Sequence, residues 1–545
     1  MFRVQLGYLA ARPTKKAVIV VDARHCEPSL NMPLLRPPRV RFAPSPTGHL
    51  HIGGLRTALF NYLFAQKTAS PTIGGDSNVK GEMILRIEDT DQNRSVPGAV
   101  ENLVKMLQWA GVEINEGPFA THQPHTPYFQ SERLDIYKDY AHELIDRGKA
   151  YHCFCSQERL AQHRRLQLKS GLGSSHYDRR CHRLPHSEVT ARLNGGESHT
   201  IRMCIPPGST TVQDLVLGRV KFRHSSIDDQ ILMKADGFPT YHLANVVDDH
   251  LMDITHVIRG EEWLPSTPKH LLLYEWLGGD PPAFVHLPLL LNTSRAKLSK
   301  RHGDVSVTDF MNKGYLPEAL CNFVALLGWN PGSGDTQEIY TMDELICKFS
   351  LDHINTGGAV VDIKKLDFIN REHIKRMCNG SASQQSILRD RAKPFFKQFV
   401  DSHSPLLADD AYVDKVLHLL QERAHTLEDY GRYGAYFFEP PIFEGNVDIK
   451  YEVQKGLNKE KWNSVVRPIL AEQFALMSDD AFSARAINTT LKSICKSDAY
   501  GLKQRDVFKP LRLQVTGMKD GVSLPSILEL LGRDVVLERL NVQVF

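Results

Sequence analysis

The most informative segment for the fold of this chain is Arg41-Phe-Ala-Pro-Ser-Pro-Thr-Gly-His-Leu-His-Ile-Gly-Gly54. A short strand, Val40 to Ala43, ends at two prolines, and Gly48 then allows a tight turn into a helix. The helical pattern consists of Leu55, Ala58, Leu59, Tyr62 and Leu63. A polar loop, residues 70–80, is expected to bulge at the surface before a second strand at residues 83–87. Strand, helix and strand in this order predict a parallel sheet that binds ligands at the carboxyl ends of its strands.

Length and composition indicate a multidomain globular chain. Its 545 residues suffice for three or four domains, and 42% hydrophobic with 24% charged residues is ordinary for globular proteins. No stretch approaches the ~20 apolar residues that span a bilayer, so we expect no membrane insertion. The nine cysteines are scattered and odd in number. That argues against a secreted disulfide framework and for a reducing compartment.

Residues 1–39 carry seven Lys or Arg against two acids, a net +5, so the remainder of a chain totalling +3 carries −2. A basic, acid-poor leader predicts a mitochondrial transit peptide at residues 1–38 and a location in the mitochondrial matrix. The alternative is a disordered N-terminal extension or a misassigned start.

A second basic segment lies further along the chain. It has seven basic residues and a single acid, Asp178; the basic residues are Arg159, Arg164, Arg165, Lys169, Arg179, Arg180 and Arg183. One interpretation is phosphate contact along an RNA stem, which predicts steep salt dependence of binding. The other is a solvated helix face.

The remaining pattern separates an insertion from a helical end. Residues 128–232 are mixed and more polar, which is consistent with an insertion between two halves of the sheet domain. Beyond about residue 320 the apolar residues recur at helical spacing, as in Val413, Val416, Leu417, Leu420, Ala424 and Leu427. The last third is therefore predicted to be an all-α domain.

Two short motifs suit nucleotide chemistry. His51, Gly53 and Gly54 open the first helix, where free backbone N–H groups and the helix dipole favour a triphosphate. Lys297-Leu-Ser-Lys-Arg301 places two ammonium groups where they can neutralise leaving pyrophosphate. Either motif alone is better explained as a helix cap or a basic surface loop. Their order and spacing together favour adenylate formation.

Residues between and beside these motifs suit a dicarboxylic amino acid. Arg41 and Arg259 can each form a forked pair with a carboxylate, and Glu88 can hold an ammonium group. Tyr241 adds a hydroxyl and Asn245 an amide. A charged hydrogen bond contributes roughly 1.5–3 kcal/mol. Losing one predicts about ten- to a hundredfold discrimination against a neutral amide analogue.

These motifs resemble those of the class I aminoacyl-tRNA synthetases, and among them the bacterial-type glutamyl-tRNA synthetases, most of all the mitochondrial form. The resemblance covers residue 40 to the C-terminus. Further matching segments are Pro127–Tyr137, Asn245–Asp249, Leu326–Asn330, Asp362–Asn370, Leu511–Gly517 and Ser526–Gly532.

The resemblance implies a multidomain α/β plus all-α fold. It places a Rossmann-like class I catalytic domain at residues 39–127 and 233–310, split by an acceptor-end-binding domain inserted at 128–232. A stem-contact region at 311–375 and a C-terminal α-helical anticodon-binding domain at 376–545 follow.

By the same resemblance, the residues divide into sets. The glutamate site is Arg41, Phe42, Ala43, Ser45, Glu88, Tyr241, His242, Leu243, Ala244, Asn245 and Arg259. ATP-binding positions are Pro46, His51, Gly53, Gly54, Glu262, Lys297, Leu298, Ser299, Lys300 and Arg301. The catalytic residues among them are His51, Lys297 and Lys300.

The implied reaction is glutamate–tRNA ligation by a monomer. ATP and Mg²⁺ activate L-glutamate to glutamyl-adenylate, and the acyl group passes to the terminal adenosine of tRNA(Glu). The sequence leaves open whether tRNA(Gln) is also charged. A catalytically inactive tRNA-binding paralogue is the alternative, although His51, Lys297 and Lys300 are all present.

Three departures from the family pattern and one cysteine group stand out. The loop at residues 70–80 is longer than expected for the family. Gly54 replaces the second histidine of the first motif, and Leu298 replaces the usual methionine of the second. We expect both replacements to be compatible with the chemistry, since His51 remains as a side-chain donor and leucine is close to methionine in volume. A further group, Cys153, Cys155 and Cys181 with Tyr177 or His182, resembles a zinc arrangement seen in some relatives. We predict no bound metal there, with a structural zinc ion as the alternative.

Overall fold

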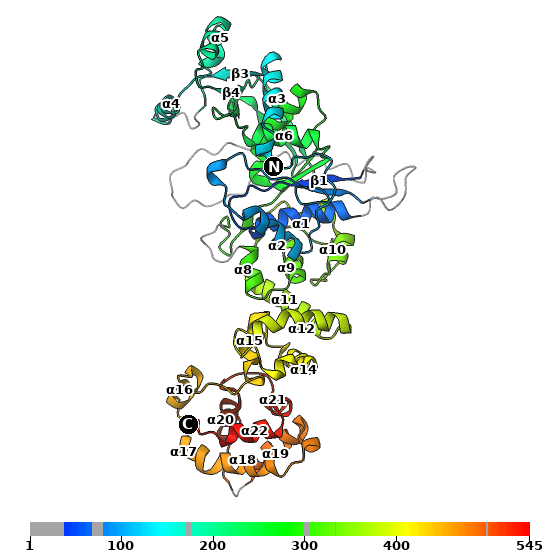
Figure 1. The fold of residues 1–545 in the computed structure, drawn as a ribbon, viewed down its shortest axis with the longest axis vertical. Coiled ribbons are helices and arrows are strands. Elements are labelled where there is room, and N and C mark those ends of the chain that lie inside the picture. Colours follow the sequence, from blue (N-terminus) through cyan, green and yellow to red (C-terminus); the bar gives the residue numbers. More distant parts are fainter. Residues whose placement is uncertain are drawn as a thin grey trace, which may run out of the picture. The chain divides into compact units, whose positions relative to one another are not determined.

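A computed structural model describes residues 37–67, 80–169, 176–298, 306–332, 334–497 and 500–544 (Figure 1). Outside these residues lie nearly all of the expected transit peptide, the expected surface loop up to residue 79, and Ser299, Lys300 and Arg301 of the second nucleotide motif. The chain divides into two compact units. The first comprises the described residues up to Val307 together with 324–336 and 340–361, and the second comprises 308–323, 337–339 and the remainder from Asp362.

The first unit begins with the predicted strand, helix and strand. Strands β1 (Arg39–Phe42) and β2 (Glu82–Leu85) pair in parallel, and α1 (Ile52–Gln66) connects them. The parallel pairing confirms the prediction from the sequence. Apolar residues of α1 on the predicted face, such as Leu55, Leu59 and Leu63, are fully buried.

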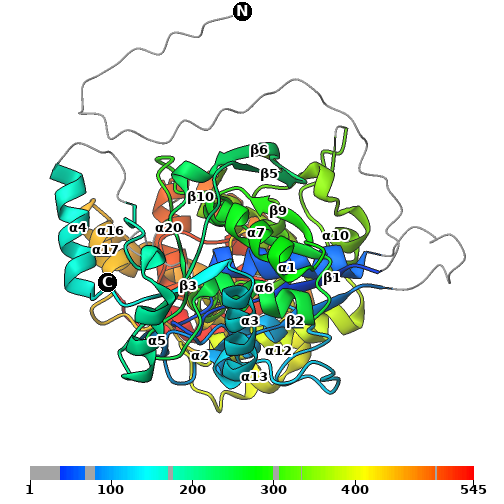
Figure 2. The same ribbon diagram turned by 90° about the horizontal axis from the view of Figure 1, so that it is seen from above.

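The first unit also contains a four-stranded sheet, with the strand order β6-β5-β9-β8. Strands β8 (His256–Gly260) and β9 (Ala283–Leu287) are parallel, and β5 (Ser209–Asp214) joins β9 in parallel at Asp214. Strand β6 (Gly218–Arg223) pairs antiparallel with β5 (Figure 2). The backbone N–H of Thr255 donates to the carbonyl of Arg39 at 2.8 Å, which connects β1 to the start of β8. Part of the range 128–232 is thus built into the sheet that carries Arg259.

The other elements of the first unit cover and extend these sheets. An antiparallel sheet has the order β3-β4-β7, with β3 at Ala150–Cys153, β4 at Thr200–Met203 and β7 at Ile231–Met233. The helices are α2 (Ala99–Trp109), α3 (Leu134–Asp146), α4 (Gln157–Lys169), α5 (His186–Asn194), α6 (Tyr241–Leu251), α7 (Thr267–Leu277) and α10 (Met342–Lys348). Strands β10 (Leu290–Leu291) and β11 (Ala359–Val360) pair in parallel. Helices α3, α6 and α7 supply much of one buried core, including Tyr137, Leu243 and Leu273.

The second unit is helical in its described part, as predicted for the last third of the chain. It contains most of α8 (Val307–Asn312) and α9 (Pro317–Ala325). The helices that follow are α11 (Ile363–Cys378), α12 (Ala382–Phe396), α13 (Pro405–Ala408), α14 (Asp410–Leu420), α15 (Leu427–Gly434), α16 (Val447–Gln454), α17 (Lys459–Lys461), α18 (Arg467–Ala475), α19 (Ala484–Lys496), α20 (Gln504–Thr516), α21 (Leu524–Leu531) and α22 (Arg533–Asn541). The apolar face predicted for residues 413–427 is buried throughout. In the described part of the chain, no helix has both the length and the apolarity needed to cross a membrane.

Candidate active site

A cavity of about 350 Å³ opens where β1 and β8 end and α1 begins. The carboxyl ends of these strands are where the sequence predicted a ligand site. The cavity collects predicted residues from both nucleotide motifs and from the amino-acid set, namely Arg41, Phe42, Ala43, Ser45, His51, Gly53, Gly54, Glu88, Tyr241, Arg259, Glu262, Lys297 and Leu298. Residues from distant parts of the sequence therefore meet in one place.

Five of the predicted residues that the structure describes do not line the cavity. Leu243 and Ala244 are fully buried and face the core under α6, because helical periodicity turns them away from Tyr241. His242 instead contacts His270, with 3.1 Å between Nδ1 and Nε2. Asn245 lies behind the cavity wall, and Pro46 also lies outside the lining.

Seven lining residues were missed by the sequence analysis: Arg56, Thr57, Ile258, Gly260, Trp263, Leu289 and Leu290. Arg56 is buried and donates to the carbonyls of Leu327, at 3.1 Å, and Pro288. Burial lowers its pKa to about 10, with Glu262 and Glu261 opposing the shift. Arg56 and Thr57 lie one helical turn after Gly53, so the helical period could have identified them.

His51 caps the helix that begins at the cavity. Its Nδ1 accepts a hydrogen bond from the backbone N–H of Gly54 at 3.1 Å, so the ring carries its proton on Nε2. Cap and phosphate donor were competing interpretations of this histidine, but one ring can fill both roles. A Cβ atom at position 54 would lie 2.8 Å from Cδ1 of Leu50, so glycine there also serves packing.

Behind the cavity wall, Arg41 belongs to a buried charge network. Its Nε lies 3.1 Å from Oδ1 of Asp249, which also accepts from Nη1 of Arg86 at 2.7 Å. With its amide oxygen facing the guanidinium groups, Asn245 accepts from Arg86 and Arg41 at 3.1 and 3.3 Å and donates to Asp249 at 3.2 Å. Burial alone would raise the pKa of Asp249, but the two arginines hold it below its ordinary value.

Glu88 lies shortly after the end of β2 and lines the cavity. Burial raises the pKa of its carboxyl, although Arg86 and Arg41 act in the opposite direction. Its contact with Arg86 is long, at 3.5 Å. A cation bound in the cavity, such as an ammonium group, would stabilise the ionised form of Glu88.

Arg259 presents the opposite charge. Its guanidinium donates to the hydroxyl of Tyr241 at 3.1 Å and to that of Thr267 at 2.9 Å. Two histidines complete its surroundings, His286 at 3.1 Å and His270 at 3.2 Å. Within the described residues no carboxylate forms an ion pair with Arg259. A carboxylate group bound in the cavity would supply a counter-ion to Arg259.

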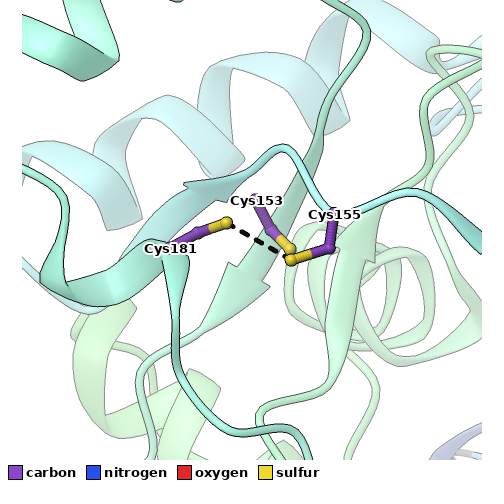
Figure 3. A group of neighbouring side chains, drawn as sticks. All are labelled: Cys153, Cys155 and Cys181. Atoms are coloured by element: carbon purple, nitrogen blue, oxygen red, sulfur yellow. Dashed lines mark hydrogen bonds between the residues drawn. The ribbon is translucent and has the colours of Figure 1, made fainter. Parts of the chain in front are cut away.

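The predicted cysteine group also comes together. Cys153 at the end of β3, Cys155 just after it, and Cys181 place their sulfur atoms within 4.8 Å of one another (Figure 3). The hydroxyl of Tyr177 lies 3.4 Å from Sγ of Cys153 and 3.3 Å from Sγ of Cys155. His182 is directed elsewhere, to Sγ of Cys204 at 3.2 Å, so of the two predicted fourth donors Tyr177 is the one that lies next to the cysteines.

This donor set fits zinc. Zinc–sulfur bonds of about 2.3 Å in a tetrahedron put sulfur atoms about 3.8 Å apart. The sulfur atoms of Cys155 and Cys181 are already 3.5 Å apart. The prediction of no bound metal stays a prediction, and the geometry argues against it.

Comparison with known proteins assigns both parts of the chain. Residues 38–368 match the family of class I tRNA synthetases (E and Q), catalytic domain, and residues 388–544 match an anticodon binding domain. A glutamate–tRNA ligase of Chlorobaculum parvum is 44% identical over 516 residues, covering 92% of this chain and 96% of the relative. A glutamate–tRNA ligase of Chlorobium phaeobacteroides is 44% identical over 517 residues, covering 92% and 97%.

Comparison with a solved structure leads to the same assignment. The crystal structure of a glutamate tRNA ligase from Elizabethkingia meningosepticum, in complex with its amino acid, superposes with a TM-score of 0.76 at 35% identity. The superposition covers 93% of this chain and 99% of that one. The fold is therefore a class I catalytic domain followed by a helical anticodon-binding domain, and the chain belongs to the glutamyl-tRNA synthetase family of bacterial type.

Proposed function

We propose that the chain activates L-glutamate with ATP and transfers the glutamyl group to the 3′-terminal adenosine of tRNA(Glu). The observation that carries this proposal is the single cavity shared by a glutamate set, Arg41, Glu88 and Arg259, and a nucleotide set, His51 and Lys297. A dicarboxylic amino acid and a triphosphate would there be held next to each other. Proximity of this kind supplies much of the rate enhancement in phosphoryl and adenylyl transfer.

In the proposed reaction, the arginines donate hydrogen bonds to the carboxylates of glutamate, and Glu88 accepts hydrogen bonds from its ammonium group. An oxygen of the α-carboxylate attacks the α-phosphorus of ATP, and pyrophosphate leaves. The proton on Nε2 of His51 donates to the phosphate as charge develops, while Lys297 neutralises the leaving group. Mg²⁺ is proposed to enter with the nucleotide phosphates, as it does where no all-protein cage exists.

The decisive assay is aminoacylation with purified components. Wild-type protein should charge tRNA(Glu) with glutamate and should exchange pyrophosphate in a glutamate-dependent manner. Lys297→Ala should lose both activities and still bind tRNA. A catalytically inactive paralogue would instead bind tRNA(Glu) without charging it, and this outcome would reject the proposal.

Three finer points belong to the same proposal. We propose that tRNA(Gln) is a second acceptor, that the enzyme is a monomer, and that it acts in the mitochondrial matrix. The last point rests on the basic composition of residues 1–39, most of which lie outside the described residues. Charging both organellar tRNAs, light scattering of the pure protein and the location of a full-length fluorescent fusion test these points in turn.

The cysteine group adds a structural proposal. Cys153, Cys155, Cys181 and Tyr177 would hold a zinc ion at one end of the β3-β4-β7 sheet. Zinc would there join a strand, a loop and a turn that share a small buried cluster. Such an ion stabilises the local fold and takes no part in the reaction.

A further inference from the structure

Among the described residues, the groups that hold Arg259 in place are all neutral. A guanidinium carries five N–H bonds, and four contacts are made here, to Tyr241, His270, His286 and Thr267. The hydroxyl of Thr267 can donate to the carbonyl of Trp263 at 3.4 Å or to Nε2 of His286 at 3.3 Å. In both cases its oxygen can accept from Arg259. One N–H on Nη2 remains for the cavity that Arg259 lines. The side chain is only 4% exposed, so its charge is almost fully desolvated.

Behind Arg259 stands a histidine–carboxylate pair. Nδ1 of His286 on β9 lies 2.6 Å from Oδ2 of Asp214 at the end of β5, and both side chains are fully buried. The other oxygen of Asp214 accepts from the backbone N–H groups of Val216 and Leu217 at 3.0 and 2.8 Å. The carboxylate thus fixes the proton of His286 on Nδ1 and leaves Nε2 as the acceptor for Nε of Arg259.

A second chain of hydrogen bonds, through two histidines, orients Arg259 in the same way. Nδ1 of His270 accepts from Arg259, so its Nε2 carries the proton and donates to Nδ1 of His242 at 3.1 Å. Burial lowers the pKa of His242 to about 3, and it lowers the pKa of His270 well below its ordinary value. Both rings are therefore neutral at physiological pH and do not repel the guanidinium.

We infer that Asp214 and His286 are positioning residues for amino-acid selection, which hold Arg259 oriented and without an adjacent counter-ion so that the cavity requires a side-chain carboxylate. The inference deepens the proposed function and rests on it. An aspartate in direct contact would neutralise Arg259 and reduce its need for substrate. An imidazole ring placed between them orients the guanidinium and keeps the two charges apart. Bound glutamine would then leave the buried charge of Arg259 unpaired, and this energetic cost would discriminate strongly against glutamine as a substrate.

Asp214→Asn tests this arrangement with little change in shape. The asparagine oxygen can still accept from Val216 and Leu217, but its amide group then donates toward Nδ1 of His286. The ring proton must move to Nε2, where it opposes the N–H of Arg259. We expect the KM for glutamate to rise roughly ten- to a hundredfold and the preference for glutamate over glutamine to fall by a similar factor. The KM values for ATP and tRNA(Glu) should stay unchanged.

Two substitutions of His286 that differ in hydrogen-bonding capacity distinguish a positioning role from a packing role. In His286→Gln the side-chain oxygen can still accept from Arg259, whereas in His286→Leu it cannot. The glutamine variant should therefore raise the glutamate KM less than the leucine variant does. His224→Gln is the matched control, since His224 is also buried between two partners, Thr210 and Pro206, and lies outside the cavity lining. It should leave the glutamate KM unchanged.

The outcomes distinguish the inference from the proposed function. A folded Asp214→Asn protein with wild-type glutamate KM and wild-type discrimination would overturn the inference, as would equal effects of the two His286 variants. If Asp214→Asn does not fold, the His286 pair decides. Calorimetric titration of L-glutamate into each protein adds a readout that needs no tRNA. Wild-type protein that binds glutamate but charges no tRNA would contradict the proposed function alone.

Discussion

The Oδ1 atom of Asp249 lies 3.1 Å from Nε of Arg41, although 208 residues separate the two along the chain. Both side chains are buried, and Arg86 donates to the same carboxylate. Helix α6 therefore anchors the guanidinium at the end of β1 from behind. Arg41, which lines the cavity, is thus oriented before any ligand arrives, and this lowers the ordering cost of binding.

The substitution Asp249→Asn should measure how much the contact between Asp249 and Arg41 contributes to stability and to glutamate binding. Removing one partner of a buried ion pair leaves uncompensated charge, which costs about 3–5 kcal/mol. We expect the free energy of unfolding in urea to fall by about that amount and the KM for glutamate to rise. Asp253→Asn is the control, because Asp253 is exposed and its φ of 55° suits asparagine. A loss below about 1 kcal/mol in Asp249→Asn would contradict the pairing.

Glu88 should set an acid limb in the pH profile of glutamate use. Its pKa is raised above the ordinary carboxyl value by burial, so lowering the pH protonates Glu88 before typical surface carboxyls and weakens binding of the ammonium group. We expect log(kcat/KM) for glutamate to fall on the acid side with a midpoint above the ordinary pKa of 4.5. Glu88→Gln should have a higher KM and lack this limb. A midpoint at or below 4.5 would contradict the burial argument.

Glu88 and Asp249 should affect stability in opposite directions. For Glu88 the folded pKa is raised, so its contribution to stability is present below the unfolded pKa and is lost as the pH rises through the folded value. For Asp249 the folded pKa is lowered, so its contribution is present above the unfolded pKa and is lost as the pH falls through the folded value. Unfolding titrations should therefore diverge from wild type with opposite slopes, above pH 4.5 for Glu88→Gln and below pH 3.8 for Asp249→Asn.

Zinc analysis decides between the sequence-based prediction and the geometry of the cysteine group. On the geometry we expect about one zinc ion per chain by elemental analysis. Cys181→Ser should lose the ion, whereas Cys321→Ser, which alters another buried cysteine, should retain it. Purified protein without zinc, whose thiols at residues 153, 155 and 181 react freely with a thiol reagent, would support the original prediction of no metal.

Local sequence patterns were enough for the elements around the site. The two prolines, the turn at Gly48 and the helical spacing that follows predicted β1, α1 and β2, and the structure confirms that the two strands are parallel. Charge and hydroxyl chemistry predicted Arg41, Glu88, Tyr241 and Arg259 as cavity residues. Within the predicted stretch Tyr241–Asn245, Tyr241 alone lines the cavity, because a helix turns consecutive side chains to different faces.

The partners behind the cavity could not be predicted in the same way. Asp214 meets His286 only because β5 joins β9, a pairing between segments that the sequence analysis assigned to different domains. Likewise, Asp249 was part of a matching segment, but nothing in that segment says that it meets Arg41. Contacts of this kind depend on strand order and on which helix face lies inward, and a single sequence shows neither.

The basic helix α4 should contribute salt-dependent affinity for tRNA. Arg159 pairs with Asp178, and Arg179 with Asp229, so part of the basic segment is already used within the fold. Arg164 and Arg165 are exposed and form no ion pair with any acid among the described residues. Replacing both with alanine should weaken tRNA(Glu) binding and reduce the slope of log K against log salt by up to about two.

Arg192 on α5 provides the control for that experiment. It is an arginine of the same region that is already paired with Glu188 and Glu197. Arg192→Ala should leave the salt slope near the wild-type value. An unchanged slope in the double variant at Arg164 and Arg165 would favour the other interpretation of α4, a solvated helix face.

His51 can be divided into its two roles by a pair of substitutions. Asparagine places an acceptor where Nδ1 lies and is a good N-cap, but it does not reach the position of Nε2. Glutamine reaches toward Nε2 but gives a poor cap. We therefore expect His51→Asn to keep the melting temperature while losing roughly a hundredfold in kcat for adenylate formation, in line with removal of one transition-state donor. His51→Gln should lose about 1 kcal/mol of stability and retain more of the activity. Equal activity in the two variants would show that Nε2 does not act on the nucleotide.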